Sequence, residues 1–245
     1  MKKLIFLFIF CPIIGYTQSI NDFFPTSNGQ LVNHTYYSLS YSEKHEQAEW
    51  VFYEIKKERM LSVAKRKDNF RIDKKISTNS ATLLDYKGSG FDRGHLAPAQ
   101  DLSFNATAMS ESFFMSNMSP QHPSFNRGIW KKLESLVRDW GTIHNIYVVT
   151  GPVFNDCSIT IGTNDVCVPK YYYKVIYEPQ EKRMISFLLP NIKGTKDLYE
   201  YVCTTDSLEK ITNIDFFQIL EDDLENKIES TIEKEFWTDI LSGKK

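Results

Sequence analysis

The sequence predicts an α+β fold in which a central antiparallel β-sheet is flanked by helices. Aromatic and β-branched runs typical of strands recur along the chain, and two of them, "KYYYKVIYE" and "RMISFLLPN", lie close enough to form a hairpin. Apolar positions at helical spacing fill the C-terminal third. No linker or internal repeat divides the chain, so residues 18–245 are expected to form a single domain.

Residues 1–17 have the pattern of a secretory signal peptide. "MKKLIFLFIFCPIIGYTQS" begins with two lysines, continues with an apolar run, and offers Gly15 and Thr17 as small residues at a cleavage site. The run is too short to span a bilayer comfortably, and the bulky Phe10 before Cys11 disfavours a lipoprotein site. The mature protein is therefore expected to begin near Gln18, to be secreted or periplasmic, and to have no membrane anchor.

The other elements follow in order along the mature chain. Residues 34–55 predict two strands around a polar turn, and residues 61–73 a basic connection. A strand containing His95, a second strand "FFMSNM" containing Asn117, and a helix that begins near Asn126 come next. Residues 146–154, "IYVVTGPVF", predict a central strand ended by Gly-Pro, and "TKDLYEYVC" and "DLENKIESTIEKEF" predict helices. The apolar stripe of the helix near Asn126 consists of Ile129, Trp130, Leu133, Leu136, Val137 and Trp140.

Charge is unevenly distributed along the chain. Removal of residues 1–17 takes away Lys2 and Lys3 and no acidic residue, so the net charge changes from −2 to −4. That value argues against a broadly basic nucleic-acid binder. Residues 56–75 nevertheless contain nine Lys or Arg against three acids, whereas residues 197–235 contain twelve acids against three lysines. Because a local basic face attracts polyanions even on an acidic protein, the basic run is either a substrate groove or a solvated surface.

Three cysteines remain after export, and an oxidising compartment favours a disulfide. Cys157 and Cys167 flank a turn-rich segment and are expected to close a hairpin-like loop. Cys203 is then left as a buried free thiol. A cysteine metal site is not expected, because the sequence contains no CxxC pair.

The segment "FDRGHLAPAQD" places a histidine beside charge and glycine, where a core histidine is not expected. With downstream polar residues it forms a set suited to phosphodiester hydrolysis: a histidine base near neutral pH, oxygen ligands for Mg²⁺, and arginine donors for phosphate. Each member also has a purely structural alternative, such as a turn histidine, a helix cap, or a surface Glu134–Arg138 pair. The set is Arg93, His95, Asn117, Asn126 and Glu134.

"DRGH", followed by "SNMSPQ" and "FNRGIWKKLE", resembles the DNA/RNA non-specific endonuclease family, whose active site is a ββα-metal finger. The resemblance extends over residues 36–191. It implies that His95 is the general base and that Asn126 is the direct protein ligand of Mg²⁺, with Mn²⁺ as a substitute. It also implies that Glu134 holds metal-bound waters, that Asn117 orients the site, and that Arg93 lies near the phosphate.

The resemblance further implies substrate binding by Arg127 and by an upstream arginine, either Arg66 or Arg71, between which the residues do not decide. The implied reaction is cleavage of single- and double-stranded DNA and RNA to 5′-phosphate ends. Gly94 is expected to let the chain turn so that the side chains on both sides of it face the groove.

Two other functions stay open at this point. One is a non-catalytic nucleic-acid-binding protein with the same fold, and the other is a phosphodiesterase or pyrophosphatase acting on small nucleotides. A plasmid-nicking assay with Mg²⁺ and with EDTA separates all three. The sequence does not decide between DNA and RNA preference, nor does it reveal sequence preference, a homodimer or an inhibitor partner.

Overall fold

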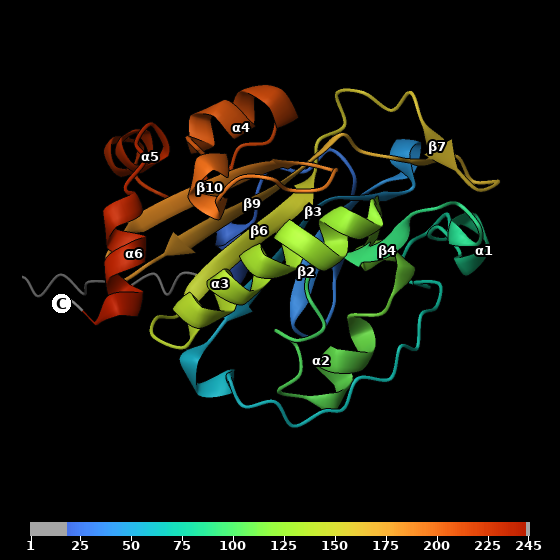
Figure 1. The fold of residues 1–245 in the computed structure, drawn as a ribbon, viewed down its shortest axis with the longest axis horizontal. Coiled ribbons are helices and arrows are strands. Elements are labelled where there is room, and N and C mark those ends of the chain that lie inside the picture. The colour runs from blue at the N-terminus through green and yellow to red at the C-terminus, as the bar shows by residue number, and fades with distance from the viewer. Residues whose placement is uncertain (1–18, 244–245) are drawn as a thin grey trace, which may run out of the picture.

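The computed structural model describes residues 19–243, and its centre is a seven-stranded antiparallel sheet (Figure 1). The expected signal peptide lies outside the described residues. The predicted α+β class is confirmed, as are the strand pair at residues 34–55 and the hairpin formed by the last two long strands. In spatial order the strands are β1 (Gln30–Asn33), β2 (Tyr37–Ser42), β3 (Gln47–Ile55), β6 (Ile146–Pro152), β9 (Tyr171–Glu178), β10 (Arg183–Pro190) and β11 (Val202–Cys203).

Side chains that alternate along the strands give the sheet two apolar faces. Along β3, Val51 and Tyr53 join one buried cluster, whereas Trp50 and Phe52 join the other. Helices α3 (Lys131–Gly141) and α6 (Lys234–Ser242) add their tryptophans to the first cluster, and Figure 1 shows α3 lying across the front of the sheet. Helices α4 (Thr205–Thr212) and α5 (Asp222–Glu229) cover the second cluster.

The smaller elements lie at the ends of the sheet and along the connections. In the described part of the chain, no helix is long and apolar enough to cross a membrane. These elements are η1 (Ile20–Phe23), η2 (Glu43–His45), η3 (Lys57–Arg59), α1 (Leu83–Tyr86), β4 (Asp92–His95), α2 (Ala106–Glu111), η4 (Met115–Asn117), β5 (Met118–Gln121), η5 (Phe125–Trp130), β7 (Thr160–Ile161), β8 (Val166–Cys167) and η6 (Leu198–Tyr201).

The C-terminal third differs from the sequence prediction in two places. "TKDLYEYVC" forms only the short turn η6 and then joins the sheet as β11, because Val202 and Cys203 pair with the edge of β10. "DLENKIESTIEKEF" is split between α5 and α6. Ile228 of α5 belongs to one face of the sheet and Trp237 of α6 to the other, so one straight helix cannot bury both side chains.

The central strand β6 ends at Gly151-Pro152, as the sequence predicts. Gly151 and Pro152 pair with Tyr173 and Tyr172 of β9. A Cβ at Gly151 would lie 2.2 Å from the carbonyl oxygen of Glu49, so the glycine also permits close packing of the strand end.

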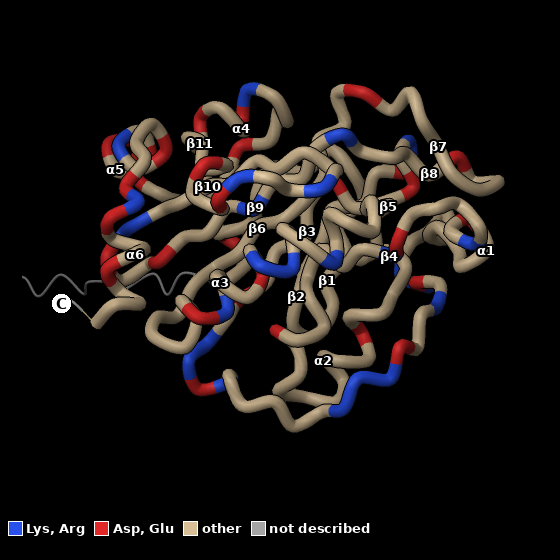
Figure 2. Tube along the Cα trace, viewed as in Figure 1, with Lys and Arg blue, Asp and Glu red and all other residues tan. Residues whose placement is uncertain are grey.

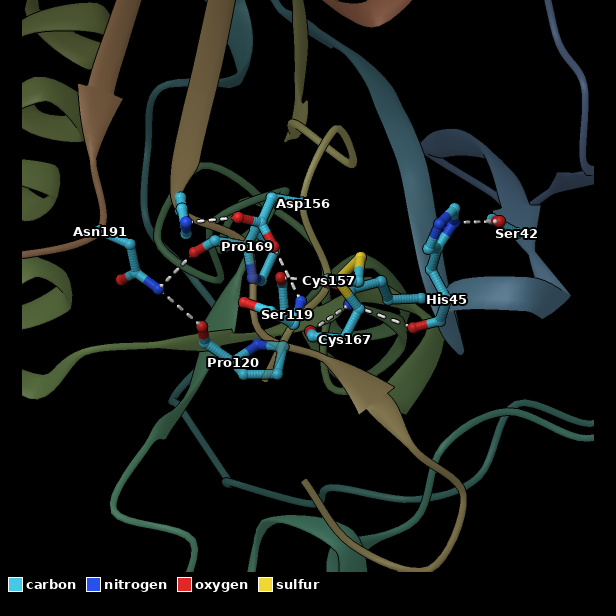
Figure 3. Close-up of a disulfide and its surroundings, with 12 residues drawn as sticks. Ser42, His45, Ser119, Pro120, Asp156, Cys157, Cys167, Pro169 and Asn191 are labelled. Atoms are coloured by element: carbon cyan, nitrogen blue, oxygen red, sulfur yellow. Dashed lines mark hydrogen bonds and ion pairs between the residues drawn. A yellow bond between two sulfur atoms is a disulfide. The ribbon is translucent and has the colours of Figure 1, made fainter. Parts of the chain in front are cut away.

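The predicted disulfide between Cys157 and Cys167 is formed, and it closes the loop that contains the β7–β8 hairpin (Figure 3). Cys203 is free and half-buried, and burial raises the pKa of its thiol to about 12. The backbone oxygen of Cys167 accepts a 2.6 Å hydrogen bond from Gln47 Nε2. Asn191 Nδ2 donates to the carbonyl oxygens of Pro169 and Pro120, which ties the connection after the disulfide to β5 (Figure 3).

Candidate active site

The candidate site is built on a short antiparallel ribbon, β4 paired with β5, followed by the helical segment η5–α3. The order strand, strand, helix agrees with the sequence prediction, but the second strand lies later in the chain than predicted and does not contain Asn117. Phe114 instead bridges to Arg71, and the next three residues form the turn η4, so β5 begins only at Met118.

Gly94 has a role different from the one predicted. It lies within β4 and makes no turn, and the side chains before and after it share a face because strand side chains alternate. A Cβ at Gly94 would lie 2.2 Å from the side-chain Cδ of Gln121 on β5. The glycine is therefore required by the close approach of a buried side chain, and the strand itself directs Arg93 and His95 to one side.

His95 lies at the base of a cleft against an aromatic wall. Its ring meets Phe113 edge-on, with ring centroids 5.0 Å apart, and Phe70 at 5.9 Å. Burial, and then the positive charge of Arg66, lower the pKa of His95 to about 3, so the imidazole is neutral at pH 7. Within the described chain Nε2 is enclosed without a hydrogen-bond partner, and Nδ1 is the ring nitrogen left open to the cleft.

Asp92 fixes two side chains that reach the same cleft. Its Oδ2 accepts a 2.9 Å hydrogen bond from Asn126 Nδ2, and both of its oxygens accept hydrogen bonds from Arg127, at 2.6 and 2.8 Å. Burial alone would raise the pKa of Asp92, but the hydrogen bonds from Arg127 and Asn126 outweigh it and hold the pKa below its ordinary value. With its amide nitrogen used in this way, Asn126 keeps Oδ1 free of protein donors among residues 19–243.

Asn126 belongs to the first helical turn, as expected, and does not cap the helix with its side chain. Its backbone nitrogen donates to the carbonyl oxygen of His122 at 2.9 Å. The segment kinks at Gly128 before the regular helix α3 begins, so the turn that carries Asn126 is offset from the helix that carries Glu134.

Glu134 reaches the cleft from α3 and is backed by a buried lysine. Lys174 of β9 is fully buried; its Nζ lies 3.4 Å from the hydroxyl oxygen of Tyr53 and 5.0 Å from the ring centroid of Trp130. Burial raises the pKa of Glu134, and the positive charge of Lys174 opposes that rise. Glu134 does not pair with Arg138, as the structural alternative proposed, because Arg138 forms an ion pair with the buried Asp101.

The cleft has a volume of about 550 Å³ and contains most of the predicted residues. An adjoining hollow of about 500 Å³ shares Asn126 and the arginines other than Arg138, and it extends toward Phe70 and Leu83. Free amide and carboxylate oxygens are the donors that Mg²⁺ prefers, so Asn126 and Glu134 fit the implied metal. The predicted residues that line the cleft are Arg66, Arg93, His95, Asn126, Arg127 and Glu134.

Asn117 is the exception among the five motif residues, because it is fully buried and does not line the cleft. Its Oδ1 accepts from the backbone nitrogen of Ala97 at 2.9 Å, and its Nδ2 donates to the carbonyl oxygens of Ala97 and Ser112. These bonds anchor the chain two residues after His95. Asn117 is thus placed to hold His95 in position without touching the substrate.

The basic run at residues 56–75 reaches the cleft only in its middle. Arg66 lines both hollows, and Lys65 and Lys67 are exposed beside it. Arg71 instead donates to the carbonyl oxygens of Asn69 and Ser110 and stacks on Phe114, so it is part of the loop's internal structure. Of the two alternatives for the run, the substrate groove therefore applies only to the part around Arg66, and the lysines at its end, Lys74 and Lys75, are exposed and line neither hollow. Figure 2 shows that acidic residues gather on α4, α5 and α6, far from β4 and α1.

Several residues at the site were not predicted from the sequence to lie there. Asp92 is the first residue of "DRGH" and was overlooked as the acceptor for Asn126 and Arg127. Lys131, inside the motif "FNRGIWKKLE", and Arg138, four residues after it, also line the cleft. Lys174 gave no local signal, because only the packing of β9 beneath α3 brings it to the site. Asp101 ends the quoted segment "FDRGHLAPAQD", but its ion pair with Arg138 of α3 could not be read from that segment.

Comparison with known proteins gives matches over most of the chain. A family model described as DNA/RNA non-specific endonuclease matches residues 16–223. The mitochondrial nuclease EXOG of Mus musculus is 32% identical over 219 residues, covering 81% of this chain but only 60% of the mouse protein. The mitochondrial endonuclease G of Homo sapiens is 32% identical over 208 residues, which cover 76% of this chain and 69% of the human protein. A nuclease of Nostoc is 30% identical over 223 residues, which cover 85% of this chain and 80% of the Nostoc protein.

The fold comparison agrees with these matches. The solved structure of EndoG in its complex with EndoGI superimposes with a TM-score of 0.72 and 29% identity, covering 79% of this chain and 87% of EndoG. The "DRGH" ribbon and the helix that carries Asn126 and Glu134 fall inside the matched residues. The chain belongs to the DNA/RNA non-specific endonuclease family.

Proposed function

We propose that the chain is an exported, metal-dependent endonuclease that hydrolyses phosphodiester bonds of DNA and RNA and leaves 5′-phosphate ends. The observation that carries this proposal is the convergence of His95 from β4, Asn126 from η5 and Glu134 from α3 in one basic cleft. Family membership supports the same class of reaction.

His95 acts as the general base in this proposal. A neutral imidazole with an open Nδ1 accepts a proton from water as the water oxygen attacks phosphorus and the bond to the 3′ oxygen breaks. Asn117 holds the backbone just beyond the histidine, so the ring keeps its orientation. The phosphate stays with the 5′ oxygen, which gives the proposed ends.

Asn126 Oδ1 and, through water, the Glu134 carboxylate are the groups that would hold Mg²⁺, with Mn²⁺ as a substitute. When bound, the cation stabilises negative charge on the phosphate and on the leaving oxygen. Asp92 fixes the amide of Asn126 so that its oxygen is presented to the cleft. Lys174, beneath Glu134, favours the ionised carboxylate.

Substrate affinity comes from the arginines. Arg93 stacks over Phe70 at 4.3 Å from the ring centroid and, with Arg66 and Arg127, lines the cleft. Contacts to phosphate carry no base identity, which fits an enzyme that accepts both DNA and RNA. Of the two upstream candidates we assign the phosphate contact to Arg66, since the guanidinium of Arg71 is occupied by backbone carbonyls.

Export is proposed from the leader-like residues 1–17 and is supported by the disulfide between Cys157 and Cys167, which suits an oxidising compartment. N-terminal sequencing of protein recovered outside the cytoplasm should give a start near Gln18. Recovery of full-length protein beginning at Met1 would contradict export by cleavage.

The experiment for the activity is incubation of supercoiled plasmid and of a structured RNA with the purified protein, in Mg²⁺, in Mn²⁺ and in EDTA. We expect nicking and then fragmentation with either metal and none in EDTA, with fragment ends that accept ligation as 5′-phosphates. Binding without cleavage would favour a non-catalytic protein. Hydrolysis confined to small diesters would favour a nucleotide phosphodiesterase.

A further inference from the structure

A cluster of carboxylates lies on the face of the sheet opposite α3. Asp206 and Glu209 come from α4 and Glu229 from the end of α5, and one carboxylate oxygen from each lies within 4.8 Å of the other two. Asp215 and Glu225 add negative charge nearby. Within residues 19–243, none of these five acids forms an ion pair with a lysine or arginine.

Glu229 distinguishes this cluster from an ordinary exposed group of acidic side chains, because it is buried. It is only 4% exposed, and its Oε1 is buried with no hydrogen-bond partner in the described chain. An ionised carboxylate buried in this way is strongly unfavourable unless a cation or a proton compensates it. Burial, and then the charges of Glu209 and Glu225, raise the pKa of Glu229 to about 9, because nothing positive faces it.

We propose that Asp206, Glu209 and Glu229 bind a divalent cation, with Ca²⁺ as the best-fitting ion. Calcium takes carboxylate oxygens at 2.3–2.6 Å, so oxygens on opposite sides of the ion are about 5 Å apart. The observed spacing of up to 4.8 Å is therefore suited to one ion between the three side chains. Mg²⁺ is the poorer candidate, because it requires shorter distances and gives up its waters reluctantly.

The bound ion would act on the fold and not on the reaction. Leu208 of α4 and Ile228 of α5 belong to the same apolar cluster, so an ion between the carboxylates joins the two helices where they already pack. The cluster shares no residue with the cleft. Asp206 and Glu209 lie within the residues that the family model matches, and Glu229 lies beyond residue 223, where that match ends.

The test is calorimetric titration of Ca²⁺ into EDTA-treated, desalted protein, combined with thermal unfolding in excess EDTA or Ca²⁺. The variants are Glu229→Gln at the cluster, Asn126→Ala at the cleft, and Asp223→Asn as an exposed acidic control on α5. Wild type, Asn126→Ala and Asp223→Asn should all bind Ca²⁺ and gain about 5–10 °C in Tm when Ca²⁺ is at ~100 times its Kd. Glu229→Gln should lose both responses and keep wild-type nicking activity in Mg²⁺.

Three outcomes would overturn the proposal: no Tm gain in wild type, a gain that Asn126→Ala abolishes, or a gain that Glu229→Gln retains. A cluster compensated by shared protons alone would give the first. If Glu229→Gln fails to fold by circular dichroism, Asp206→Asn, which is less buried, replaces it with the same expected result. Because the readouts do not depend on catalysis, their failure leaves the proposed nuclease activity untouched.

Discussion

Buried carboxylates are compensated differently in the cleft and at the helices α4 and α5. In the cleft, Asp92 is paired with Arg127, Asp101 with Arg138, and Glu134 is faced by Lys174. At the helices α4 and α5, no described lysine or arginine forms an ion pair with Asp206, Glu209 or Glu229, although Glu209 accepts a hydrogen bond from the backbone nitrogen of Phe216. Opposite charges therefore hold the cleft in one geometry without an ion, whereas the acidic cluster has no positively charged side chain to balance its carboxylates.

The largest effect is expected from His95→Ala, which removes the proposed base. Activity should fall by about 10²–10⁴-fold. Because burial depresses the pKa of His95 to about 3, protonation in acid favours the unfolded state, so this residue costs stability as the pH falls from about 6.5 toward 3. The variant should therefore lose less stability than wild type over that range, as measured by urea unfolding. Near-normal nicking would refute the assignment.

The next effect is expected from Asp92→Asn, which tests whether ion pairing fixes the cleft. An amide cannot accept from Asn126 and Arg127 as the carboxylate does, so activity should fall by about 10–100-fold, the range for residues that orient a metal ligand. The apparent affinity for Mg²⁺ should weaken in a metal titration of kcat. Asp139→Asn, an exposed acid on α3, is the control. Equal effects of the two changes would remove Asp92 from its positioning role.

Lys174→Met tests the buried cation beneath Glu134. Since Lys174 works against the burial-driven rise in the pKa of Glu134, its removal should raise that pKa and move the acid limb of the pH–rate profile to higher pH. At pH 7 kcat/KM should fall by about tenfold and should recover as the pH rises. Lys182→Met, in the β9–β10 turn, serves as the exposed control. A drop that is the same at every pH would indicate a packing defect.

The smallest effect is expected from reversing Lys65 and Lys67 to Glu, next to Arg66. For each lysine that neutralises a phosphate in the wild type, the reversal should flatten the slope of log affinity against log salt by roughly 0.7–0.9, and KM should rise at low salt. The control is the double reversal of Lys57 and Lys74 to Glu. Both lysines belong to the same basic run but are not neighbours of Arg66, the residue of the run whose side chain lines the cleft, so this reversal should have less effect. If both pairs change KM equally, long-range charge and not a local groove attracts the substrate.

Local patterns in the sequence were enough to predict most strands and helices and to identify the chemical groups of the motif. Strand alternation in β9 and β10, the apolar stripe of α3 and the paired cysteines all gave correct predictions, because each depends on neighbours within a short segment. "DRGH" and "FNRGIWKKLE" likewise identified His95, Asn126 and Glu134, and these lie in one cleft.

Only the tertiary structure decided what those residues touch. In the folded protein Arg66 lines the cleft and Arg71 does not, and Asn117 is buried behind the site. Lys174 lies under Glu134, although its strand is about forty residues further along the chain. The tertiary structure also split the last predicted helix, since Ile228 and Trp237 are buried on opposite faces of the sheet. The physical reason is common to all four: side-chain burial and charge compensation depend on distances between elements, which no local pattern in the chain encodes.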